Sequence, residues 1–129
     1  MTSSNTALPI HHKILYIDDD LSNGFLMKRV LEADGYAVVL ASSGSKGLDL
    51  AHREPPDLIL LDIYMPGMNG HEVARRLRKE VDTKNTPILA VSASPNADDR
   101  RLSLEAGCNG YIAKPIDVDL ISEQVAAYL

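Results

Sequence analysis

The chain has 129 residues, about the length of one folded domain, and its hydrophobic fraction of 45% and charged fraction of 24% are those of an ordinary globular protein. That composition argues against intrinsic disorder and against a fibrous repeat. The formal net charge of -5 leaves no broad basic field to hold a phosphate backbone, so we expect no direct binding to nucleic acid.

The cysteine count and the hydropathy pattern indicate the cellular compartment in which the protein is expected. A single cysteine, Cys108, excludes an internal disulfide framework and fits a reducing compartment. The wholly aliphatic runs, such as 58–61, are far shorter than the roughly 20 residues that cross a bilayer. Residues 1–12 are polar and aperiodic and do not resemble a secretory signal. We therefore expect a disordered tail over 1–12, one domain over 13–129, a cytoplasmic location and no membrane contact.

Five short, continuously apolar runs alternate with segments of helical spacing. The runs are residues 14–17, 37–40, 58–61, 88–91 and 111–113. They are too short for helices and too uniformly apolar for a sheet with one wet face, which indicates parallel strands covered on both faces. The apolar positions of the five predicted helices are Leu21, Phe25, Met27, Val30 and Leu31; Leu48 and Ala51; Val73, Ala74, Leu77 and Val81; Ala97, Leu102 and Ala106; and Val118, Ile121, Val125 and Leu129.

This alternation predicts an α/β fold, a doubly wound five-stranded parallel sheet with right-handed crossovers. The common strand order for five strands is 2-1-3-4-5, as in flavodoxin-like (βα)5 folds. Asp20 is a predicted N-cap of the first helix, and Gly35 and Gly107 are predicted stops of the first and fourth helices.

Polar side chains follow four of the five predicted strands. Asp18 and Asp19 follow the first strand, Asp62 the third, Ser92 the fourth and Lys114 the fifth. In open α/β sheets, ligands bind beyond the carboxyl ends of the strands, where the strand order reverses. Because the first and third strands are neighbours in this order, the three carboxylates should converge.

Three converging carboxylates repel one another unless they are protonated or a cation binds. Hard oxygen ligands that leave room for water and a phosphate favour Mg²⁺, and the absence of His and Cys from these strand ends argues against zinc. The ammonium of Lys114 and the hydroxyl of Ser92 are donors that suit a phosphoryl group. Asp62 is then a candidate phosphoryl acceptor, since an aspartate carboxylate can act as a nucleophile.

Four segments together resemble a known family. ILYIDDD, LILLDIYMPGMNG, AVSAS and GYIAKPID, in this order and spacing, are similar to the receiver domain of two-component response regulators, including those of the chemotaxis type, over residues 13–129. The resemblance implies that Asp62 is the phosphoacceptor and that Asp19 binds Mg²⁺ directly. It also implies that Asp18 assists through water and Tyr64 through its backbone carbonyl.

The same resemblance assigns the residues that respond to phosphorylation. Ser92 and Lys114 would contact the phosphoryl group, and Tyr111 would swing inward on activation. The peptide bond between Lys114 and Pro115 would be cis. Such a domain catalyses only its own phosphorylation and dephosphorylation and is not an enzyme acting on other substrates.

The resemblance also implies two kinds of partner. A histidine kinase or a histidine phosphotransfer protein would donate the phosphoryl group, and a downstream protein would contact the fourth helix, the fifth strand and the fifth helix. Whether phosphorylation drives dimerisation is left open. The sequence stops about one helix after the fifth strand, which fits both a stand-alone receiver and a receiver excised from a larger hybrid kinase or multidomain regulator.

Two other classes of protein place an anion or a nucleophile at this edge of a sheet. A phosphatase of the haloacid dehalogenase type needs a second aspartate two positions after the first, and this chain has Tyr64 there. A flavodoxin-like electron carrier would have to seat an anionic cofactor phosphate against three carboxylates. Both alternatives fit the strand-end residues less well than the receiver.

Overall fold

The computed structural model describes residues 12–93 and 96–129, so the predicted tail lies outside the described residues except for His12. Five parallel strands form one sheet in the order β2-β1-β3-β4-β5, as predicted. The strands are β1 (Lys13–Ile17), β2 (Ala37–Ala41), β3 (Leu58–Asp62), β4 (Ile88–Ser92) and β5 (Gly110–Ala113). The helices are α1 (Leu21–Ala33), α2 (Gly44–Arg53), α3 (Gly70–Lys79), α4 (Ala97–Ala106) and α5 (Ile121–Ala126).

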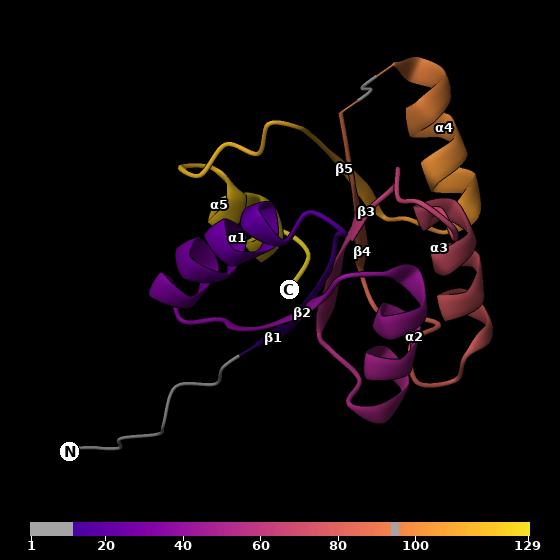
Figure 1. Ribbon diagram of the computed structural model, residues 1–129, viewed down its shortest axis with the longest axis horizontal. Helices are drawn as coiled ribbons and strands as arrows, with labels where there is room; N and C mark the ends of the chain where they lie inside the picture. The colour runs from indigo at the N-terminus through magenta and orange to yellow at the C-terminus, as the bar shows by residue number, and fades with distance from the viewer. Residues whose placement is uncertain (1–11, 94–95) are drawn as a thin grey trace.

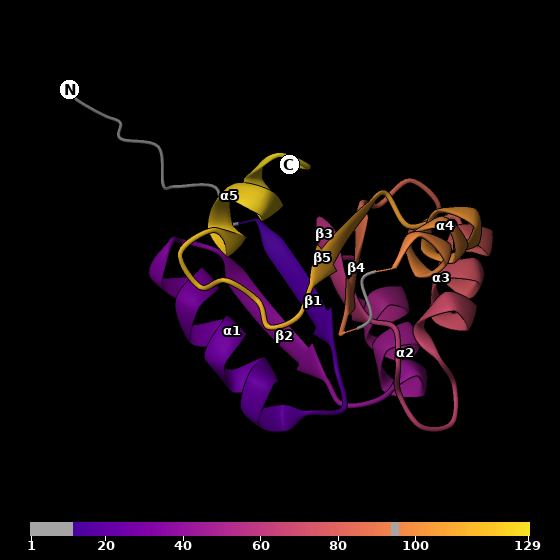
Figure 2. The same cartoon turned by 90° about the horizontal axis from the view of Figure 1, so that it is seen from above.

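Helices cover both faces of the sheet, α1 and α5 on one side and α2, α3 and α4 on the other (Figures 1 and 2). Two hydrophobic clusters fill the two interfaces, and β3 contributes to both. Ile59 and Leu61 pack toward the three-helix side, whereas Leu58 and Leu60 pack toward the two-helix side. Because successive side chains of a strand point to opposite faces, a strand buried on both sides must be apolar at every position. No helix among the described residues is long and apolar enough to cross a membrane.

The helix ends carry the predicted caps. The side chain of Asp20 accepts a hydrogen bond from the backbone N–H of Asn23 at the start of α1. Gly35, with φ of 96°, follows the end of that helix, and Gly107, with φ of 112°, is the C-cap of α4. Both glycines adopt the left-handed conformation that side chains disfavour, which explains why each helix stops where it does.

Two predicted helices are shorter than their apolar spacing suggests. The assignment of Val81 to the third helix is wrong, because α3 ends at Lys79 and Val81 is 82% exposed. The hydroxyl of Thr83 turns back and donates to the carbonyl of Leu77, which satisfies an acceptor in the last turn. Val118 likewise lies before α5, which begins only at Ile121.

The side chain of Arg78 ties together the loops at the amino edge of the sheet, opposite the carboxyl ends of the strands. Its guanidinium donates to the carbonyl of Gly107 at 2.9 Å, to that of Thr86 at 2.7 Å and to the side-chain oxygen of Asn109 at 2.7 Å. Asn109 also accepts from the backbone N–H of Ile88 at 2.9 Å. One arginine therefore connects α3, the end of α4 and the beginning of β4.

We expect Gly70→Ala to lower the free energy of unfolding by about 1–3 kcal/mol. A Cβ at this position would lie 2.5 Å from the carbonyl oxygen of Asp62 and 2.7 Å from Cα of Ile63, and neither backbone atom can move aside easily. Urea unfolding followed by circular dichroism measures the change.

Gly24→Ala is the matched control, because a Cβ there lies at an ordinary 3.5 Å from the side chain of Leu40. Alanine is about 1 kcal/mol better than glycine inside a helix, so this variant should be at least as stable as the wild type. Equal urea midpoints for Gly70→Ala and wild type would contradict this prediction. They would show that the loop after β3 can move to accommodate a Cβ at position 70.

Candidate functional site

Two buried carboxylates meet at the carboxyl edge of the sheet. Ile17 pairs with Leu61 across β1 and β3, so Asp18 and Asp62 are the next residues of two neighbouring strands. Each is only 3% exposed, whereas Asp19 is exposed. Oxygen atoms of these three carboxylates all lie within 4.8 Å of one another, as the strand-end pattern predicted.

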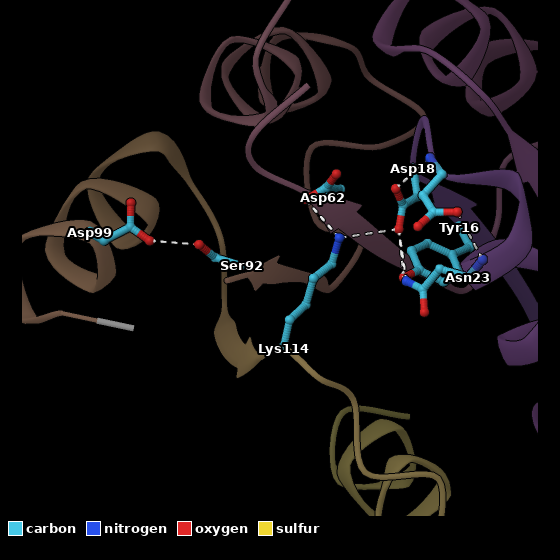
Figure 3. A network of polar contacts seen from close by, with 8 residues as sticks. Tyr16, Asp18, Asn23, Asp62, Ser92, Asp99 and Lys114 are labelled. Carbon is cyan, nitrogen blue, oxygen red and sulfur yellow. Dashed lines mark hydrogen bonds and ion pairs between the residues drawn. The ribbon is translucent and has the colours of Figure 1, made fainter. Parts of the chain in front are cut away.

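Lys114 reaches this cluster from the end of β5 (Figure 3). Its Nζ lies 3.4 Å from Oδ1 of Asp62 and 3.5 Å from Oδ2 of Asp18. The peptide bond between Lys114 and Pro115 is cis, as the family resemblance implied. A single ammonium thus contacts both buried carboxylates and offsets part of their repulsion.

A tyrosine and an asparagine orient the carboxylate of Asp18, and neither was predicted as a site residue. The hydroxyl of Tyr16 and the side-chain amide of Asn23 each donate to Oδ2 of Asp18 at 3.0 Å, and the amide also donates to that hydroxyl at 2.8 Å (Figure 3). The backbone N–H of Asp20 donates to Oδ1 at 2.9 Å. The only sequence signal was a tyrosine in an apolar strand, since a buried phenol needs a hydrogen-bond partner.

The two buried carboxyls have pKa values displaced in opposite directions. Burial alone would raise the pKa of Asp18, but the hydrogen bonds from Asn23 and from the backbone of Asp20, together with the charge of Lys114, lower it below its ordinary value. Burial, followed by the charge of Asp18, raises the pKa of Asp62 to about 7. The geometry therefore favours an ionised Asp18 beside an Asp62 that holds its proton more tightly.

Two of the three residues predicted to respond to phosphorylation, Ser92 and Tyr111, contact a different carboxylate. Ser92, fully buried at the end of β4, donates from its hydroxyl to Oδ2 of Asp99 at 2.9 Å. Tyr111 donates to the same oxygen at 2.5 Å, and Tyr64 donates to Oδ1 at 2.5 Å. The hydroxyl of Ser92 points toward Asp99, on the side away from Asp62 (Figure 3).

Asp99 is 3% exposed, and no sequence pattern marks it as a site residue. Burial alone would raise its pKa, but hydrogen bonds from the three hydroxyl donors lower the pKa below its ordinary value. In the sequence it is one of two aspartates in the first turn of a helix, a position where acidic residues are common because they complement the helix dipole. Only its neighbours in space distinguish it from Asp98.

A family model covers nearly all of the described residues. The family model for the response regulator receiver domain matches residues 14–126. The polar-differentiation response regulator DivK of Brucella ovis is 35% identical over 116 residues, which are 90% of this chain and 94% of that relative. The chain therefore belongs to the response regulator receiver domain family of two-component signalling systems.

Solved structures agree in fold with this assignment. The chemotaxis protein CheY4 of Vibrio cholerae is similar with a TM-score of 0.90 at 27% identity, covering 93% of this chain and 100% of that one. The receiver domain of the sensor histidine kinase PA1611 from Pseudomonas aeruginosa has a TM-score of 0.85 at 28% identity, covering 92% and 98%. That receiver holds a magnesium ion coordinated in its active-site cleft. This protein is accordingly a signalling module of the kind that interacts with kinases and downstream partners.

The raised pKa of Asp62 predicts a pH-dependent cost in metal-free protein. Because Asp62 binds its proton more tightly in the folded state, the folded protein loses stability as the pH rises from the carboxyl's ordinary pKa of 3.8 toward about 7. Asp62→Asn removes this loss. Because one pKa unit corresponds to about 1.4 kcal/mol, we expect the variant to exceed wild type in free energy of unfolding by at least ~1 kcal/mol at pH 8.

The difference should shrink toward zero near pH 3, where the wild-type carboxyl is largely protonated in both the folded and the unfolded state. Urea unfolding in EDTA at both pH values measures it. Asp49→Asn is the control, since Asp49 is an exposed partner of Arg53 on α2 and its loss should change little. A variant less stable than wild type at pH 8 would contradict the repulsion inferred at the strand ends.

Proposed function

We propose that Asp62 accepts a phosphoryl group from a phosphorylated histidine of a histidine kinase or a histidine phosphotransfer protein. The observation that carries this proposal is the placement of Asp62 at the end of β3, within the carboxylate cluster and in contact with the ammonium of Lys114. A carboxylate oxygen forms a bond to phosphorus while the bond from phosphorus to the histidine nitrogen breaks, and the imidazole keeps that electron pair. Water later hydrolyses the acyl phosphate and restores the carboxylate.

The three clustered carboxylates would hold Mg²⁺. We assign Asp19 as a direct ligand, with Asp62, and Asp18 as a ligand through water; the backbone carbonyl of Tyr64 completes the set. The donor set fits, because all groups are hard oxygen atoms and the cluster has an excess of negative charge. Bound Mg²⁺ would neutralise the repulsion that raises the pKa of Asp62 and would offset charge on the transferring phosphoryl group.

Lys114 and Ser92 would contact the phosphoryl group once it is attached. The ammonium of Lys114 already lies against Asp62, so it needs little movement to contact a phosphoryl oxygen. The hydroxyl of Ser92 would have to turn away from Asp99, and Tyr111, which shares that carboxylate, would lose a neighbour there. We propose that this rearrangement shifts the population of two conformations and so transmits the signal.

We place the downstream contact on α4, β5 and α5. These elements hold or follow the residues that would respond to phosphorylation. Apolar side chains are exposed there, Leu102 and Leu104 on α4 and Tyr128 just after α5. The same surface is the candidate interface for a phosphorylation-dependent dimer. The net charge of -5 supports a protein partner rather than nucleic acid, and we propose a cytoplasmic site of action.

The phosphoacceptor assignment predicts one phosphoryl group on wild type and none on Asp62→Ala. We expect intact mass spectrometry to show a single addition after incubation with Mg²⁺ and acetyl phosphate, and no addition in EDTA. The acyl phosphate should hydrolyse on standing. Equal labelling of wild type and Asp62→Ala would contradict the assignment, as would many turnovers of an external phosphate ester.

The metal assignment predicts that Asp19→Asn weakens Mg²⁺ binding by roughly ten-fold or more, since even an outer-shell partner of a metal ligand is worth that much. Isothermal titration calorimetry measures the affinity. The control is Asp20→Asn, which removes an adjacent charge but leaves a residue that caps a helix equally well. Equal weakening by both variants would show that Asp19 acts through its charge alone rather than as a ligand.

A further inference from the structure

A buried carboxylate outside the phosphorylation site gathers hydroxyl groups from three parts of the fold. Asp99 lies in the first turn of α4, where its own N–H donates to the side chain of the N-cap residue Asn96 at 2.7 Å. Tyr64 reaches it from the loop after β3, Ser92 from the end of β4 and Tyr111 from β5. A buried charge is costly unless it is hydrogen-bonded, so these three donors stabilise Asp99 where it stands.

The hydroxyl of Ser92 limits what this arrangement can do. A serine hydroxyl carries one proton and can donate one hydrogen bond at a time. In this structure the Ser92 hydroxyl donates to Oδ2 of Asp99 at 2.9 Å, and it also lies in hydrogen-bond contact with the hydroxyl of Tyr111. Ser92 therefore cannot donate to a phosphoryl group on Asp62 without giving up Asp99, and the two acceptors compete for one donor.

Loss of the Ser92 bond has consequences at Asp99. Oδ2 would keep only Tyr111 of its two hydroxyl donors, inside a site that is 3% exposed. An under-satisfied buried carboxylate is unfavourable, so Tyr111 or the first turn of α4 has to adjust. The ring of Tyr111 also lies 5.4 Å from the guanidinium carbon of Arg100, the next residue of α4, which adds a second link between β5 and that helix.

We propose that Asp99 is a positioning residue that holds Ser92 and Tyr111 in the unphosphorylated arrangement and competes with the phosphoryl group for the Ser92 hydroxyl. It thereby couples occupancy of Asp62 to the position of α4. The proposal rests on the proposed function of Asp62 as phosphoacceptor. Asp99 itself touches neither the carboxylate cluster nor Lys114 in the contacts described above.

Asp99→Asn is the central test. The amide is nearly the same shape and keeps one oxygen acceptor, but hydrogen bonds to a neutral acceptor are about half as strong as those to a charged one. We therefore expect the variant to bind beryllofluoride, a phosphoryl mimic, about five-fold or more tightly than wild type in the presence of Mg²⁺. If Asp99 had only a structural role, Asp99→Asn would weaken beryllofluoride binding or leave it unchanged.

The matched control is Asp98→Asn. It removes the same charge from the same helical turn, but the Asp98 side chain is 86% exposed and pairs only loosely with Arg101, at 3.7 Å. Its beryllofluoride affinity should equal that of wild type. In a Ser92→Ala background, Asp99→Asn should no longer raise the affinity, because the competition requires the Ser92 hydroxyl.

A reduced or unchanged affinity in folded Asp99→Asn would overturn the proposal, as would an equal gain in Asp98→Asn. Amide hydrogen exchange of the unphosphorylated protein separates this result from a failure of the proposed function. Exchange around Ser92, Tyr111 and the first turn of α4 should be faster in Asp99→Asn than in Asp98→Asn, and equal exchange would overturn the positioning role. If wild type neither binds beryllofluoride nor gains a phosphoryl group while exchange does differ, the phosphoacceptor assignment fails and the hold on Ser92 and Tyr111 stands.

Discussion

The repulsion between Asp18 and Asp62 is the constraint around which the site is arranged. Two neighbouring parallel strands end together, so their next side chains meet inside a poorly hydrated pocket. Tyr16 and Asn23 favour the ionised form of Asp18, and its negative charge then raises the pKa of Asp62. Lys114 offsets part of this cost but cannot remove it. The carboxylate cluster therefore keeps an excess of negative charge, which a divalent cation would offset.

The sheet provides the rigidity on which this balance depends. Because both faces of β3 are packed against helices, the strand cannot slide or rotate to separate the carboxylates. Close backbone packing at Gly70 adds to this restraint just after Asp62. The charged groups are therefore held together by apolar packing that has no chemical role of its own. This explains how a small domain can maintain an unfavourable cluster of charge.

The sequence predicts a site residue correctly where its position follows from the direction of a strand. Asp18, Asp62 and Lys114 could be predicted to meet because parallel strands bring their carboxyl ends to one edge. Val81 was misassigned because apolar spacing continued past the true end of a helix, which is set by the contact between Thr83 and Leu77.

The contacts of Asp99 could not be predicted from periodicity or from strand ends. Its donors Tyr64, Ser92 and Tyr111 are scattered along the chain, and the sequence points each of them to the metal or the phosphoryl switch rather than to a shared carboxylate. The role of Tyr16 was hidden in a similar way, because an aromatic residue in an apolar strand is most simply part of the core. Side-chain hydrogen bonds between distant elements require three-dimensional placement before they can be recognised.

The two ends of α4 are held in different ways, so the helix can rotate about its C-terminal end. Its C-terminal end is fastened through Gly107 to Arg78, whose other hydrogen bonds reach the loops before β4 and β5. Its first turn is tied to the sheet through hydroxyl groups that can turn about single bonds. Ten helical residues span about 15 Å, so a small displacement at the first turn swings α4 about a pivot near Gly107. The exposed leucines of α4 would then move by unequal distances, greatest for those farthest from the pivot.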